Sequence, residues 1–166
     1  MSMPISEKNF LERIASHVPG IAGYREREER RETDRRLREF LAARLDEGRG
    51  ALNGLRNRAT DAGELKVLDT IGRLDRALQK SVSSLRYADY GYSGVFDQVK
   101  IGEAELEQIY AYDASLIADV TGVSEKLRAA GAGPAELASL AGLADVADQL
   151  DVKIVRRHEV LEKPTV

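Results

Sequence analysis

The feature that most limits how this chain can fold is a set of apolar seams, in which large aliphatic side chains recur every three or four residues. The clearest seam consists of Val67, Ile71, Leu74, Leu78, Val82 and Leu85. This spacing places side chains on one face of an α-helix, and such a face is buried by packing against other helices. The same spacing recurs in four further stretches. The sequence therefore predicts an all-α protein.

Turn residues divide these seams into one short helix and four long ones. The predicted helices span residues 6–17, 25–62, 64–88, 103–130 and 134–161. Gly63 and the turn at 131–134 are short connections, which make the helices on either side of each turn antiparallel. We expect a single domain over residues 1–166, folded as an antiparallel four-helix bundle with a short additional N-terminal helix.

A pair of closely spaced glycines lies inside the longest predicted helix. Gly48 and Gly50 each cost about 1 kcal/mol relative to alanine inside a helix. Either they let a neighbouring helix approach closely, or they mark a bend or break. The sequence leaves both interpretations open.

Composition and motifs argue against common kinds of catalytic site. The chain has no cysteine, which excludes disulfides, zinc–thiolate sites, iron–sulfur clusters and cysteine nucleophiles. Glu-x-x-His, the motif of di-iron bundles, is absent because Ile14 and Val155 stand three residues before the two histidines. Gly-x-Ser-x-Gly and the glycine motifs that bind nucleotides are absent as well. We expect no catalytic residue, no metal site and no cofactor.

The distribution of charge and of apolar residues bears on the partners. Residues 103–151 hold 2 Lys and Arg against 10 Asp and Glu, and this acidic block would repel nucleic acid. No run of about 18 apolar residues occurs, and the N-terminus lacks the pattern of a signal peptide. We predict no binding of nucleic acid, no integral membrane segment and a cytoplasmic location.

One group of polar residues is expected inside the bundle. Asp113 falls on or beside the inward seam of its helix, and a buried carboxylate is costly unless it is paired, usually with arginine. The stretch 25–36 has no aliphatic residue and offers arginines, and 87–97 holds four of the nine aromatic residues. The candidate members of this polar cluster are Arg31, Asp34, Arg35, Tyr90, Tyr92, Asp97 and Asp113.

Two interpretations of that cluster remain open. It either fixes the register of the helices or forms a small polar pocket. His158 lies on the seam of the last helix, and we interpret it as a half-buried histidine at a helix end rather than a catalytic base.

Three motifs together resemble a known family. They are a Pro-Gly-x-x-Gly-Tyr turn at 19–24, an Arg/Glu-rich helix at 30–38, and a Gly-Tyr-Ser-Gly-x-Phe-Asp-x-Val loop at 91–99. In these motifs the chain resembles an uncharacterised family of small all-helical bacterial proteins, over roughly residues 10–125. The last helix pair departs from that pattern. The resemblance implies a helical fold and a bacterial source, and it brings no assigned activity.

The leading functional prediction is a non-enzymatic interaction or scaffold protein that binds a protein partner or forms a homo-oligomer. The alternative is a ligand-binding or enzymatic bundle that uses the cluster near residues 87–113, which requires a concave pocket and carboxylates with shifted pKa values. Peripheral membrane association ranks below both, because arginines alternate with glutamates along 25–36.

Overall fold

The computed structural model describes residues 5–87 and 102–162, which form helices joined by turns, with no strand in these ranges. The helices are α1 (Ile5–His17), α2 (Arg27–Asp61), α3 (Leu65–Tyr87), α5 (Glu103–Ala129) and α6 (Leu137–Glu162), and a 3-10 turn, η2 (Pro134–Glu136), precedes α6. The predicted all-α class is confirmed, and the helix ends lie within three residues of the predicted ones.

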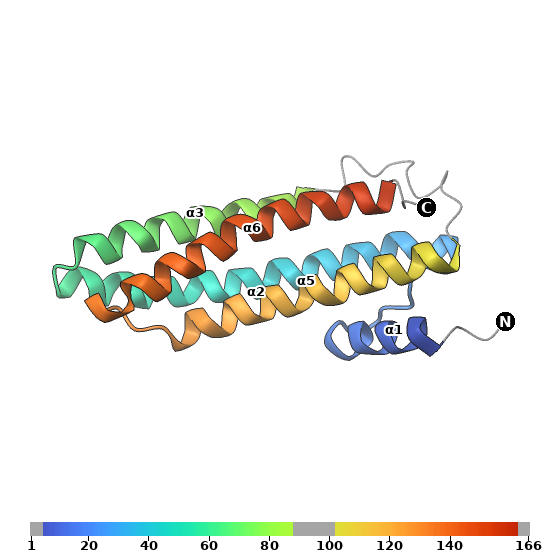
Figure 1. Cartoon of the computed structure of the whole chain (residues 1–166), viewed down its shortest axis with the longest axis horizontal. Helices are drawn as coiled ribbons and strands as arrows, with labels where there is room; N and C mark the ends of the chain where they lie inside the picture. The colour runs from blue at the N-terminus through green and yellow to red at the C-terminus, as the bar shows by residue number, and fades with distance from the viewer. Residues whose placement is uncertain (1–4, 88–101, 163–166) are drawn as a thin grey trace.

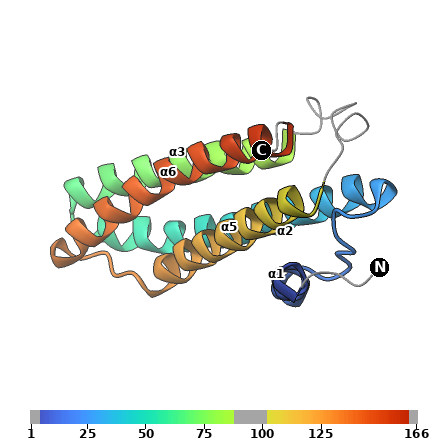
Figure 2. The same cartoon turned by 45° about the vertical axis from the view of Figure 1, so that its right-hand side comes forward.

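The four long helices lie in two layers, with α3 and α6 in one layer and α2 and α5 in the other (Figures 1 and 2). α2 packs against α3 and α5, and α6 packs against the same two helices, so the contacts form a closed ring. The short helix α1 packs on α5 near the end of the molecule where α2 begins (Figure 1).

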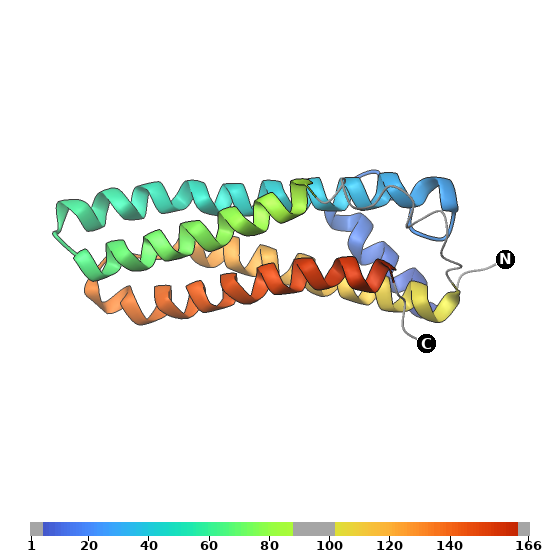
Figure 3. The same cartoon turned by 90° about the horizontal axis from the view of Figure 1, so that it is seen from above.

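The directions of neighbouring helices follow from the contacts between them. Each hairpin, α2 with α3 and α5 with α6, is antiparallel as predicted (Figure 3). Between the hairpins the neighbours run parallel. Arg73 and Ser84 of α3 bond to Asp145 and Asp151 of α6 in the same order along both helices. The helices are therefore antiparallel within each hairpin and parallel where the two hairpins meet.

α2 is one continuous helix through Gly48 and Gly50, so the break considered near them does not occur. A Cβ atom on Gly48 would lie 3.1 Å from Leu127 Cδ1 and 3.3 Å from Ser124 Oγ of α5. A Cβ on Gly50 would meet nothing within 4 Å. Gly48 thus permits the close approach of α5, and Gly50 faces open space.

The apolar seams fill the centre of the bundle. All six seam residues of α3 are buried, and Leu37, Leu41 and Leu45 of α2 have no exposed surface. Among the described helices, none combines the length and the apolar character needed to cross a lipid bilayer.

Candidate functional site

A buried ionic cluster lies where α2, α5 and α6 meet. Its centre is Arg157 of α6, whose Nε donates to Oδ1 of Asp113 at 2.7 Å and whose Nη1 donates to Oδ1 of Asp34 at 2.6 Å. These three side chains are at most 3% exposed. Two carboxylates from α2 and α5 are therefore joined by one arginine from the last helix.

Tyr24 and Arg38 complete this cluster. The Tyr24 hydroxyl donates to Oδ2 of Asp113 and accepts from Nη2 of Arg157, each at 2.7 Å. Arg38 donates from Nε to Oδ2 of Asp34 at 2.8 Å and from Nη1 to the carbonyl oxygen of Leu85 at 2.9 Å, which links the cluster to α3. From here on, the buried cluster means Tyr24, Asp34, Arg38, Asp113 and Arg157.

The turn before α2 places Tyr24 in the buried cluster. Gly23 has a φ of +113°, and a Cβ there would lie 2.6 Å from the hydroxyl of Tyr110, so only glycine fits. That hydroxyl accepts a hydrogen bond from the backbone N–H of Tyr24 at 2.8 Å. Thr33 Oγ1 donates to the carbonyl of Gly23 and accepts from its N–H. The Gly-Tyr end of the turn therefore has a direct structural reason.

Helical spacing explains which arginines of α2 enter the bundle. Asp34 and Arg38 are four residues apart, so they share the inward face with Arg30, whose Nε donates to the Tyr24 carbonyl. Arg31 and Arg35 were predicted to join this cluster, but they lie one residue further on, on the exposed face. Arg35 instead pairs with the exposed Glu39.

Of the other predicted members of the cluster, Asp34 and Asp113 lie together, joined through Arg157. Tyr90, Tyr92 and Asp97 lie outside the described residues. On α6 the fully inward position belongs to Arg157 and not to His158, which is half-buried as interpreted from the sequence.

The electrostatics of the buried cluster are balanced, because two guanidinium groups face two carboxylates. Burial raises the pKa of the Tyr24 phenol well above its ordinary value, and the negative charge of Asp113 adds to this effect. The neutral phenol therefore stays bonded between Asp113 and Arg157. The hydrogen bonds described above join these side chains to one another or to backbone, which is typical of a structural joint.

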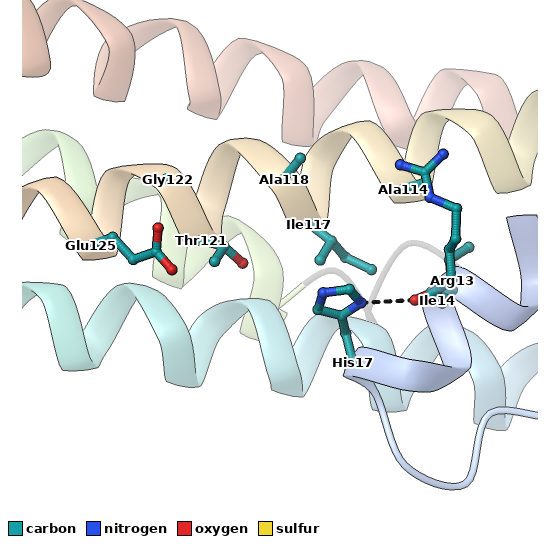
Figure 4. Close-up of a pocket in the computed structure, with 9 residues that line it drawn as sticks. All are labelled: Arg13, Ile14, His17, Ala114, Ile117, Ala118, Thr121, Gly122 and Glu125. Atoms are coloured by element: carbon teal, nitrogen blue, oxygen red, sulfur yellow. Dashed lines mark hydrogen bonds between the residues drawn. The ribbon is translucent and has the colours of Figure 1, made fainter.

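Two hollows lie near this region. One, of about 420 Å³, is lined by Arg38, Ser84, Tyr87 and His158 together with Ile154, Val155 and Glu159. The other, of about 270 Å³, lies between α1 and α5, with Ile14 and Ile117 at its apolar wall (Figure 4). In the second hollow Nδ1 of His17 is bonded to the carbonyl oxygen of Arg13 at 2.8 Å.

Sequence reasoning missed three of the five cluster members, namely Tyr24, Arg38 and Arg157. For two of these residues, the helical spacing in the sequence could have indicated an inward position. Arg38 stands one helical turn after Asp34, and Arg157 fills the gap in the seam between Ile154 and Leu161. Tyr24 precedes its helix, where no periodicity assigns a side chain to a face.

Within the described ranges, no three histidine, aspartate or glutamate side chains are grouped so that they could hold a metal ion. Comparison of the chain with protein-family models, with curated proteins and with solved structures gave no match.

Proposed function

We propose that this chain is a non-enzymatic helical interaction or scaffold protein, which binds a protein partner or a second copy of itself. In this proposal α2, α3, α5 and α6 form a four-helix bundle of two antiparallel hairpins in one domain, and α1 is the short additional helix. The resemblance to an uncharacterised bacterial family remains a prediction and contributes no activity to the proposal.

Ion pairs cross the seams between neighbouring helices of this arrangement. Arg49 of α2 bonds to Asp75 of α3 at 2.9 Å, and Arg128 of α5 pairs with Glu47 of α2. α3 is tied to α6 through Arg73, which bonds at 2.6 Å to both Asp145 and Asp148. These seams present mostly paired charges to solvent.

The fourth seam, between α5 and α6, is the observation that supports an interaction role. Among the described residues two ion pairs join α5 to α6, the buried pair of Arg157 with Asp113 and the more exposed pair of Lys153 with Asp119. Two hollows of about 470 Å³ each lie along it. Val146 and Val152 are 44% and 57% exposed there. Exposed apolar side chains beside a hollow are typical of surfaces that bind other proteins. We call this surface the α5–α6 groove.

The alternative of a ligand-binding or enzymatic bundle requires a ligand to reach the buried cluster. Of its five members, Arg38 alone lines the 420 Å³ hollow beside it. The Nε and Nη1 atoms of Arg38 already donate to Asp34 and to the Leu85 carbonyl. Asp113 is 1% exposed. These contacts favour the interaction proposal over chemistry at the cluster.

Site-specific photo-crosslinking tests the proposal. A photoreactive amino acid is placed at Gln149, an exposed position that lines the α5–α6 groove. The control position is Leu65, which is 73% exposed at the start of α3 and lies outside that groove. In the cells that produce the protein, we expect cross-linked protein adducts from position 149 and none from position 65. Equal or absent adducts at both positions would overturn the proposal.

A further inference from the structure

We infer that the α5–α6 groove binds the same groove of a second copy of this chain, in a two-fold symmetric dimer centred near Val146. This inference rests on the proposed function, because it names the partner that binds the α5–α6 groove. A two-fold interface requires one surface to be complementary to itself after rotation. Both the shape and the charges of the groove meet this requirement.

The groove follows one face of α6, and its midpoint lies at Val146. From Ala138 to Arg156 the groove follows α6 for about 27 Å. Val146 lines both hollows and therefore lies where they meet. The residues of α6 that face outward over the groove follow alternating steps of three and four: Ser139, Gly142, Val146, Gln149, Lys153 and Arg156. This is the spacing by which two helices pack along their length.

The two halves of that seam differ in side-chain size. Ser139 and Gly142 are small and exposed in one half, and Lys153 and Arg156 are long in the other. When two copies of α6 run antiparallel about Val146, Lys153 of one copy lies opposite the small Ser139 of the other, and Arg156 lies opposite position 136. The α5–α6 groove therefore has room for its own rotated copy.

The charges on the rim of the groove are also complementary to those of a second copy rotated about Val146. One end carries Glu136 of η2, and the other carries Arg156 of α6. Glu136 and Arg156 stand ten residues before and ten residues after Val146. A two-fold rotation about Val146 places Glu136 beside Arg156 of the second copy, and Arg156 beside Glu136 of the second copy.

These charges also argue for a second copy over an unrelated partner. Within the described part of the chain, no ion pair to Glu136 or Arg156 is formed, so both are available for contacts. A uniformly acidic or uniformly basic partner would meet like charge at one end of the groove. Opposite charges across an interface favour the matching partner and set its register.

Sedimentation velocity of the purified full chain tests the dimer, at loading concentrations from about 1 µM to about 1 mM. We expect a shift from monomer to dimer across this range. Val146→Glu places two carboxylates together at the two-fold axis, and it should raise the dissociation constant at least about tenfold. The matched control is Val155→Glu, because Val155 is 52% exposed on the opposite side of α6 and should leave the dissociation constant unchanged.

Two further variants test the symmetry. Glu136→Arg should weaken the dimer about tenfold, and Glu136→Arg combined with Arg156→Glu should restore it, because the pair is reversed and not lost. The chain has no cysteine. A single Val146→Cys substitution should therefore form a disulfide between two copies under mild oxidation, and Val155→Cys should not.

The outcomes separate this inference from the proposed function. A chain that stays monomeric up to about 1 mM overturns the inference, as does a dimer that ignores Val146→Glu and the charge reversal. If the purified chain is monomeric while position 149 still cross-links to a different protein in cells, the interaction proposal stands and the second copy is the wrong partner. If neither experiment gives a complex, both proposals fail.

Discussion

Arg157 contacts more members of the buried cluster than any other residue described there. Its three nitrogen atoms donate to Asp34, Asp113 and Tyr24 at distances of 2.6 to 2.7 Å. Removing one partner of a buried ion pair leaves the other charges without compensation, which is far more costly than losing an exposed pair. The stability of the fold should therefore be sensitive to this one side chain.

Substitution Arg157→Met tests this directly. We expect the free energy of unfolding to fall by about 3–5 kcal/mol, because Asp34 and Asp113 lose their shared cation. Urea denaturation followed by circular dichroism measures the loss. The control Arg76→Met replaces an exposed arginine and should change stability by less than about 0.5 kcal/mol. Equal effects of the two substitutions would contradict the role given to Arg157.

Tyr24 makes the stability depend on pH in the alkaline range. Its pKa in the folded state is raised above the value in the unfolded chain, chiefly by burial. The contribution of the neutral phenol is complete below the unfolded pKa near 10, and it is lost as the pH rises from there through the folded pKa.

A comparison with Tyr24→Phe measures this contribution. The variant lacks the bonds to Asp113 and Arg157, so it should be less stable than the original chain at neutral pH. Above pH of about 10 the two free energies of unfolding should converge, because only the original chain loses a phenol contribution. If the free energies of unfolding of the two proteins differ by the same amount from pH 8 to 11, within about 0.3 kcal/mol, then Tyr24 does not titrate as described.

Within a single helix, Gly48 and Gly50 of α2 have opposite roles. Gly48 faces α5 at close range, and Gly50 faces open space. Gly48→Val should lower the free energy of unfolding by about 1–3 kcal/mol, because its methyl groups would overlap Leu127 and Ser124. Gly50→Ala should raise it by up to about 1 kcal/mol through helix propensity alone. Thermal denaturation of both variants checks the two signs.

The helices were predictable because each seam is a local pattern. The spacing of Val67, Ile71 and Leu74 identifies a buried face without reference to any other part of the chain. The pairing inside the buried cluster is not local. Asp34 and Arg157 are 123 residues apart, and periodicity shows that a side chain points inward without showing which helix it meets. For that reason Asp113 was expected to be buried with an arginine, while the arginine was assigned to α2 and not to α6.

At the scale of the whole molecule, the two hairpins lie side by side with parallel contacts between them. Among the described helices α5 follows α3 in sequence, yet the two occupy opposite corners of the ring, and α2 and α6 occupy the other two. The bond from Arg157 to Asp34 crosses the centre between α2 and α6. The buried cluster is thus the place where both hairpins and the turn at Tyr24 are tied together.

The long sequence separation between the members of the buried cluster affects the order in which contacts form during folding. The hydrogen bond between Tyr24 and Arg157 joins residues 133 positions apart, whereas the contacts within each hairpin close through short turns. Contacts that require long loop closure form late, so the hairpins should assemble before the arginine docks. Arg157→Met should then accelerate unfolding in stopped-flow denaturant jumps and leave the refolding rate within about threefold. A refolding rate that falls in proportion to the lost stability would instead place the arginine in the folding nucleus.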